Sequence, residues 1–149
     1  MKKLLIPIII LVLIQFIPNF SSKEETDAYS IEKGYVIPDN VKETLKNACD
    51  DCHSDKTVSP WYTNIQPVGF WINHHVNEGK EHLNFSSFMK LPGKVQRHKL
   101  DEVIETVEEG EMPLSSYTYF GLHPKANLSE QQKGELIAWA RDLKSKIKD

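Results

Sequence analysis

The sequence lacks several features that mark common classes of protein. It contains only two cysteines, so a zinc site built from four cysteines is excluded. It also lacks an excess of positive charge. Beyond residues 1–22, which include Lys2 and Lys3 but no acid, there are 16 basic and 21 acidic residues, a net charge of −5. A mildly acidic domain is not a nucleic-acid binder by its electrostatics. The chain has no internal repeat and no low-complexity tract.

No segment alternates apolar and polar residues for long enough to predict a sheet, whereas four segments repeat apolar residues at helical spacing. Helices are predicted at about 40–48, 67–79 and 94–109, and from Ser129, where Gln132 completes a capping box. Glycines are expected to end the second and third helices. The apolar stripes are Val41, Leu45 and Ala48; Val68, Trp71, Ile72, His75 and Val76; Leu100, Val103, Ile104 and Val107; and Leu136, Trp139, Ala140, Leu143 and Ile147. With 40% hydrophobic and 26% charged residues, the sequence predicts one small all-α domain.

The N-terminus resembles an export signal. Lys2 and Lys3 precede an apolar run from Leu4 to Ile17 that only Gln15 interrupts. The run is shorter than the ~20 residues of a typical spanning helix. No small residues follow it at the position of a cleavage site, so an uncleaved signal-anchor is favoured over a removed signal peptide.

These features predict three regions. Residues 1–20 form the signal-anchor or signal peptide, residues 21–36 a polar spacer, and residues 37–149 the folded domain. The domain is expected on the periplasmic side, anchored to the inner membrane by the N-terminal segment.

Both cysteines lie in one five-residue run, Cys49-Asp50-Asp51-Cys52-His53. This is C-x-x-C-H, the attachment signature of c-type haem. Two thiols three residues apart on one turn can add to the two vinyl groups of a single porphyrin, and the next imidazole then lies under the ring. The sequence therefore predicts one covalent haem c, with Cys49 and Cys52 as thioethers and His53 as the proximal iron ligand.

Other interpretations of C-x-x-C are a redox dithiol, a disulfide or half of a zinc site. A thioredoxin-type dithiol should follow a strand and open a helix, whereas these cysteines come at the end of the predicted helix 40–48. The six histidines show no zinc-finger spacing. Because His53 and an export signal accompany the cysteines, covalent haem is the favoured interpretation, with a disulfide as the alternative.

Two residues compete for the sixth position on the iron. Met112 follows a glycine-ended helix and precedes Pro113, and a thioether ligand favours ferrous iron. Its alternative role is to fill the core, as methionines commonly do. His75 lies on an apolar stripe and is either the distal ligand, a pocket residue or an ordinary hydrogen-bonded core histidine.

Aromatic side chains suit the walls of a haem pocket because the macrocycle is flat and apolar. Ordinary core packing would explain each of them equally well. The other histidines have no assigned role, although His123 is placed where it could contact a haem edge. The candidate wall residues are Trp61, Tyr62, Phe70, Trp71, Tyr117 and Tyr119.

The order of these elements resembles class I cytochrome c, in which first and last helices cross and the methionine of a Met-Pro pair is the second axial ligand. Here that position is Met112. A closer resemblance, over nearly the whole body, is to the small exported haem-binding domain proteins, a cytochrome c-like family with an N-terminal membrane segment. The matching segments are Pro60-Trp61-Tyr62, Ile65-Gln66-Pro67-Val68, Trp71, His75-Val76, Glu78-Gly79, Leu83-Asn84-Phe85-Ser86, Glu111-Met112-Pro113-Leu114, Tyr117-Thr118, His123-Pro124, Ala126 and Leu128-Ser129.

Taken together, the motifs predict a monohaem c-type cytochrome that transfers single electrons and is not an enzyme. Its partners would be redox proteins and, through the N-terminal segment, the membrane, with no nucleic acid. The alternative is a haem-based sensor or a peroxidase-like enzyme with an open sixth position on the iron. A haem-free redox dithiol or metal-binding module is the third possibility.

Overall fold

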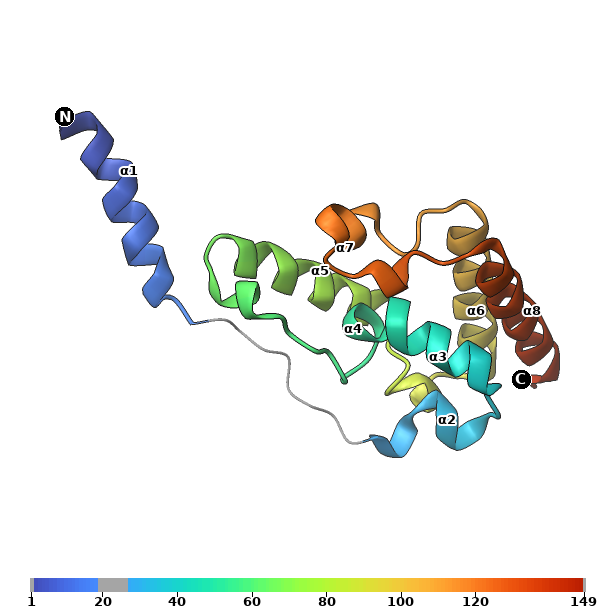
Figure 1. Ribbon diagram of the computed structural model, residues 1–149. Helices are drawn as coiled ribbons and strands as arrows, with labels where there is room; N and C mark the ends of the chain where they lie inside the picture. The colour runs from blue at the N-terminus through green and yellow to red at the C-terminus, as the bar shows by residue number, and fades with distance from the viewer. Residues whose placement is uncertain (1, 19–26, 149) are drawn as a thin grey trace.

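The computed structural model describes residues 2–18 and 27–148, and within them every regular element is a helix. Figure 1 shows a bundle of helices with one further helix projecting from it. The α-helices are α1 (Lys2–Leu13), α2 (Ile31–Gly34), α3 (Asp39–Ala48), α4 (Asp50–His53), α5 (Val68–His82), α6 (Gly93–Glu108), α7 (Ser115–Thr118) and α8 (Glu130–Lys146). Short 3₁₀ turns are η1 (Ile14–Phe16), η2 (Asp27–Tyr29), η3 (Trp61–Asn64), η4 (Phe88–Lys90), η5 (Tyr119–Gly121) and η6 (Pro124–Ala126). The all-α prediction is confirmed.

The core lies between α3, α6 and α8. Helices α6 and α8 lie side by side, and α3 packs against α8. Their facing side chains are buried because each helix carries an apolar stripe at helical spacing. The buried core consists of Ile31, Val41, Leu45, Leu83, Phe85, Phe88, Leu100, Ile104, Val107, Leu136, Trp139, Ala140, Leu143 and Ile147. The stripes predicted for α3, α6 and α8 therefore form the core.

Two of the predicted helix boundaries are confirmed. The Ser129 side chain accepts from the Gln132 backbone N–H while the Gln132 side chain accepts from the Ser129 N–H, which completes the capping box at α8. Gly110 adopts φ +75°, a conformation that ends α6 and that side chains with a Cβ rarely adopt. The expected stop at Gly79 is wrong, since α5 continues to His82.

The predicted spacer is partly folded onto the domain. Residues 21–26 of it lie outside the described residues, but Ile31 is a buried core residue whose N–H donates to the Phe85 carbonyl over 2.9 Å. The Tyr35 hydroxyl donates to Gln96 Oε1 over 2.7 Å. The domain therefore begins before residue 37, because a short apolar stretch within the polar segment fills part of the core.

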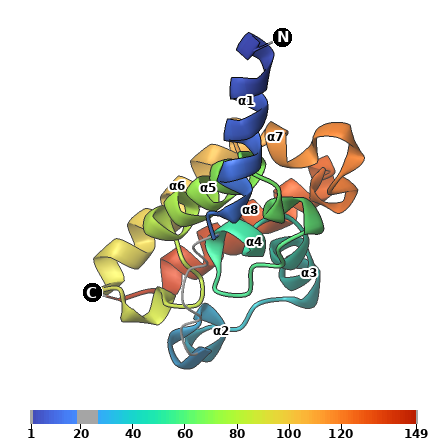
Figure 2. The same cartoon turned by 90° about the vertical axis from the view of Figure 1, so that its left-hand side faces the viewer.

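Helix α1 projects from the domain, as both views show (Figures 1 and 2). From Leu5 to Leu13 its apolar side chains are exposed on all sides. Among the described residues, no helix is both long enough and apolar enough to cross a bilayer.

Candidate functional site

The cysteine motif forms a single helical turn directly after α3. The Cys49 N–H donates to the Leu45 carbonyl, which closes α3. The N–H groups of Cys52 and His53 both donate to the Cys49 carbonyl, over 3.1 and 2.8 Å, and so form α4. The core side chains of α3 thus fix the position of the motif.

The imidazole of His53 is held by backbone carbonyls. Its Nδ1 lies 3.0 Å from the carbonyl oxygens of both Gly79 and Leu83, at the C-terminal end of α5. A protonated Nδ1 donates to these oxygens and leaves Nε2 as the nitrogen that can bind a metal ion, the arrangement typical of metal-ligating histidines. Burial lowers the pKa of His53, although the two hydrogen bonds to backbone carbonyls oppose this effect. The lowered pKa favours the neutral form of the imidazole, which can bind a metal ion.

Gly79 allows α5 to lie directly against this turn. A Cβ atom at Gly79 would lie 2.6 Å from the Cys52 carbonyl oxygen, closer than real contacts allow. The glycine therefore serves a close approach within α5 rather than a helix end. That approach brings the Gly79 carbonyl within reach of His53.

We expect Gly79→Ala to lower the free energy of unfolding by about 1–3 kcal/mol, the usual cost of overpacking, although alanine favours helices by ~1 kcal/mol over glycine. Gly134→Ala on α8 is the matched control. Nothing lies within 4 Å of a Cβ there, so that change should stabilise the chain slightly. Urea unfolding of both variants measures the difference, and equal effects would contradict the close approach.

Both cysteines are free thiols that strongly resist ionisation. Burial, with smaller contributions from Asp50 and from Cys52, raises the pKa of Cys49 to about 12. Burial and the Asp51 carboxylate raise the pKa of Cys52 to about 11. Reactive redox cysteines need a lowered pKa. This environment disfavours the redox-dithiol interpretation.

Cys52 lines an apolar cavity of about 380 Å³. Three parts of the chain enclose it: the loop 57–63, the N-terminal half of α5, and the segment 114–123. Its volume falls within the ~300–1,000 Å³ typical of cofactor pockets. The predicted apolar stripe of α5 lines this cavity instead of packing into the core. Only one of its members, Val76, is buried, and all of them line the cavity: Val68, Trp71, Ile72, His75 and Val76.

The predicted wall residues divide between the cavity and the outside. Tyr62, Trp71, Tyr117 and Tyr119 line the cavity. Trp61 lies outside it, 75% exposed, with its ring edge against Tyr62. Phe70 is not among the lining residues either.

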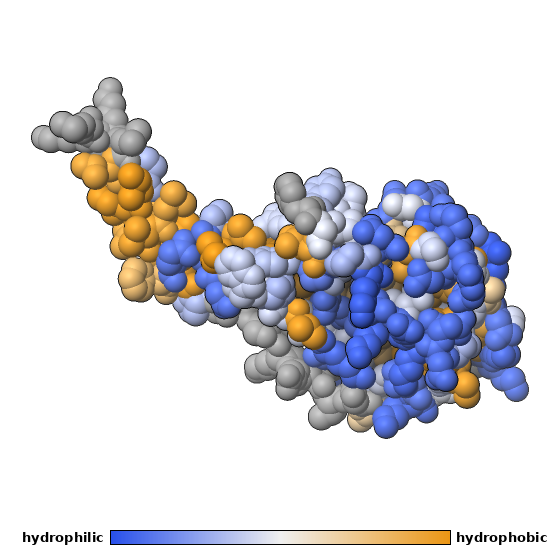
Figure 3. Space-filling model, viewed as in Figure 1, coloured by the Kyte–Doolittle hydropathy of each residue, from blue (hydrophilic) through white to orange (hydrophobic). Residues whose placement is uncertain are grey.

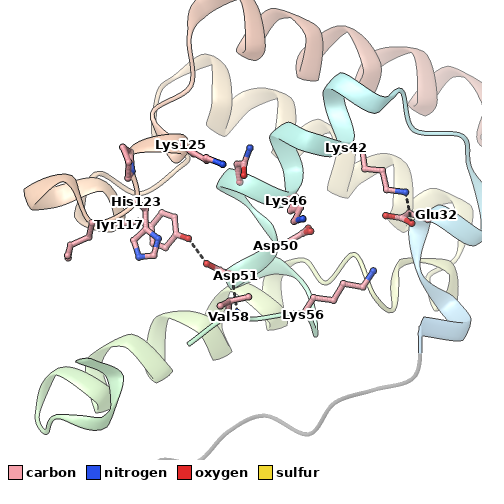
Figure 4. A pocket seen from close by; sticks show the side chains of 13 residues that line it. Glu32, Lys42, Lys46, Asp50, Asp51, Lys56, Val58, Tyr117, His123 and Lys125 are labelled. Atoms are coloured by element: carbon pink, nitrogen blue, oxygen red, sulfur yellow. Dashed lines mark hydrogen bonds and ion pairs between the residues drawn. The ribbon is translucent and has the colours of Figure 1, made fainter. Parts of the chain in front are cut away.

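A hydrogen-bonded group on the cavity wall was not predicted from the sequence. The Tyr117 hydroxyl donates to Asp51 Oδ2 over 2.5 Å, and the Val58 N–H donates to Asp51 Oδ1 over 2.9 Å (Figure 4). The Tyr117 ring stacks on His123 at 4.0 Å, and His123 Nε2 lies 2.9 Å from the Tyr62 hydroxyl. Burial and the hydrogen bond to Asp51 raise the pKa of Tyr117. This group ties the middle of the motif to segments 57–63 and 114–123.

The two candidates for the sixth ligand lie in different surroundings. His75 lines the cavity, with its ring edge against Trp71 at 4.6 Å and its Nδ1 3.6 Å from a Glu78 carboxylate oxygen. Met112 is half-buried against the core, and its N–H donates to the Thr106 carbonyl over 3.1 Å. Met112 does not line the cavity, although Leu114, two residues later, does.

A second hollow of about 720 Å³ lies on the other side of Asp51, and charged side chains border it. Lys42, Lys46, Lys56 and Lys125 border it together with acidic side chains, and it shares Asp51 with the apolar cavity (Figure 4). A flat apolar macrocycle fits the apolar cavity better than this one.

The site is thus that of a helical cofactor-binding domain: an imidazole held by two carbonyls, two thiols on one helical turn, and an apolar cavity that Cys52 lines but Cys49 and His53 do not. The model of the haem-binding domain family matches residues 9–142. The chain belongs to that family. No curated protein and no solved structure matches it.

The residues present fit a haem. Cys52 lines the cavity, aromatic rings form part of its walls, and two carbonyls orient the His53 imidazole, whose lowered pKa favours the neutral form. The haem-binding prediction is confirmed at the level of the family. Covalent attachment and the iron ligands remain predictions.

Proposed function

We propose that this protein is a monohaem c-type cytochrome that carries single electrons. The arrangement of His53 supports this proposal most directly, because a histidine with Nδ1 fixed by two carbonyls presents Nε2 in one direction only. In the proposed holoprotein, Cys49 and Cys52 hold the ring by thioethers. A bound haem would supply the redox couple.

The chain's own groups would set the properties of that couple. The apolar side chains of the cavity would surround part of the ring, and the carbonyls of Gly79 and Leu83 would increase the basicity of the His53 ligand. The Asp51–Tyr117 hydrogen bond fixes the wall on the side of the segment 114–123. A site whose wall is held by such hydrogen bonds suits electron transfer, which needs little rearrangement between oxidation states.

A redox titration tests this function. We expect one reversible one-electron transition per chain and no carbon monoxide binding by the reduced protein, because two side chains would occupy both axial positions. Carbon monoxide binding in the unaltered protein would contradict it.

The second candidate is a haem-based sensor or peroxidase-like enzyme with an open sixth position. The location of Met112 against the core, outside the cavity, favours this alternative. It would make the same C-x-x-C-H attachment but leave one face of the iron to a small ligand.

We also propose that the domain works on the extracytoplasmic side, attached to the inner membrane by its N-terminal segment. Lys2 and Lys3 and the exposed apolar side chains of α1 from Leu5 to Leu13 support this location. Membranes washed in high salt should retain the protein, and N-terminal sequencing should find residues 1–4. A soluble form that starts near Ser21 would show that the segment is removed.

A further inference from the structure

Several large apolar side chains near the cavity are exposed, and four of them lie within residues 61–71. Trp61 is 75% exposed, Ile65 45%, Val68 43% and Trp71 50%. They come from η3, the following loop and the first turn of α5, and we call them the rim surface because Val68 and Trp71 also line the cavity. A group of exposed apolar side chains at one end of a domain marks a surface that contacts something other than water.

The chain around the rim surface carries no charge. From Thr57 to Asn73 there is no acidic, basic or histidine residue, in a chain in which 26% of the residues are charged. Tryptophan is enriched where proteins meet the headgroup region of a bilayer. A surface that binds an acidic or basic protein usually carries charged residues of the opposite sign. The uncharged composition here therefore favours contact with lipid over contact with such a protein.

The rim surface is fixed beside α1 by the only polar side chain of the apolar run. Gln15 Nε2 donates to the Gln66 carbonyl over 2.9 Å, and the Gln66 N–H donates to Gln15 Oε1 over 2.9 Å. Ile65 directly precedes this attachment point. The start of α5 is accordingly the part of the domain nearest α1 (Figures 1 and 2), and the apolar surface of α1 reaches the domain there (Figure 3).

We propose that the rim surface lies on the headgroup region of the lipid bilayer into which α1 inserts, with Gln15 holding the two together. This inference rests on the proposed membrane attachment. Its occupant is lipid because the rim surface continues the exposed apolar surface of α1 and has the uncharged, tryptophan-containing composition of a membrane interface. The cavity beside Cys52 would then open close to the membrane, within reach of partners embedded in it.

Photocrosslinking to lipid tests the proposal. The full chain carrying Trp61→p-benzoylphenylalanine is reconstituted into phosphatidylcholine vesicles and irradiated, and adducts are measured by intact mass. We expect a lipid adduct at this position. The matched control is His98→p-benzoylphenylalanine, because His98 is exposed and belongs to α6, a helix on the side of the domain away from α1 (Figure 1); it should give no adduct.

Flotation of the unaltered chain with the vesicles separates the two possible failures. A chain that does not float overturns the membrane attachment and this inference with it. A chain that floats but gives no lipid adduct at position 61, or gives a chain-to-chain adduct instead, overturns this inference alone. Gln15→Leu should still float but lose most of the adduct at position 61, and an undiminished adduct would overturn the role of Gln15.

Discussion

Replacing Cys52 with alanine is expected to reduce sharply the yield of protein that keeps its haem after denaturation. One of the two thioethers can no longer form, so that only one covalent bond is left to hold the ring. The remaining protein should show a pyridine haemochrome band shifted to that of a haem with one free vinyl group. The measurement is haem staining on a denaturing gel after maturation with a haem c attachment system.

Two further variants complete this experiment. Cys49→Ala combined with Cys52→Ala should retain no haem after denaturation. Ser59→Ala, an exposed position close to the cavity, should retain as much as the unaltered chain. Retention of haem by the double variant would show that the cysteines do not attach it.

The second large effect concerns the sixth ligand. If Met112 binds the iron, the oxidised protein is low-spin and shows the weak near-infrared band of a methionine–iron bond. Met112→Ala should abolish this band, open the site to imidazole or cyanide, and lower the reduction potential by on the order of 100 mV, within the ~0.8 V range that axial ligands control. The potential falls because a thioether favours ferrous iron.

His75→Ala is the matched comparison. It should leave the near-infrared band intact if Met112 is the ligand. A change of ligation with His75→Ala and none with Met112→Ala would instead identify a bis-histidine cytochrome of lower potential. If neither change alters ligation, the iron has an open sixth position and the sensor or enzyme interpretation is preferred.

The sequence predicted the helices most accurately where the apolar stripe of a helix packs into the hydrophobic core. The stripes of α6 and α8 are buried as expected except for Val103, which is partly buried, and both the Ser129 capping box and the turn at Gly110 depend on local chemistry that a single segment reveals. Ile31 was missed because a single apolar residue in a polar stretch has no periodicity from which its burial can be inferred.

The site was predicted less completely, because apolar periodicity does not distinguish a core from a cofactor pocket. The stripe of α5 has the same spacing as the others, yet Trp71 and His75 line a cavity. Gly79 was read as a helix end, since a close approach to Cys52 depends on an element distant in sequence. For the same reason, the contacts of Asp51 with Tyr117, and of His123 with Tyr62, had no sequence signal.

Covalent attachment is tested most directly by the intact mass of the unaltered chain, matured with a haem c attachment system and measured in denaturing solvent. We expect the mass of the chain plus one haem, because thioethers to Cys49 and Cys52 survive denaturation. The mass of the bare chain, with haem released into acidic organic solvent, would contradict it.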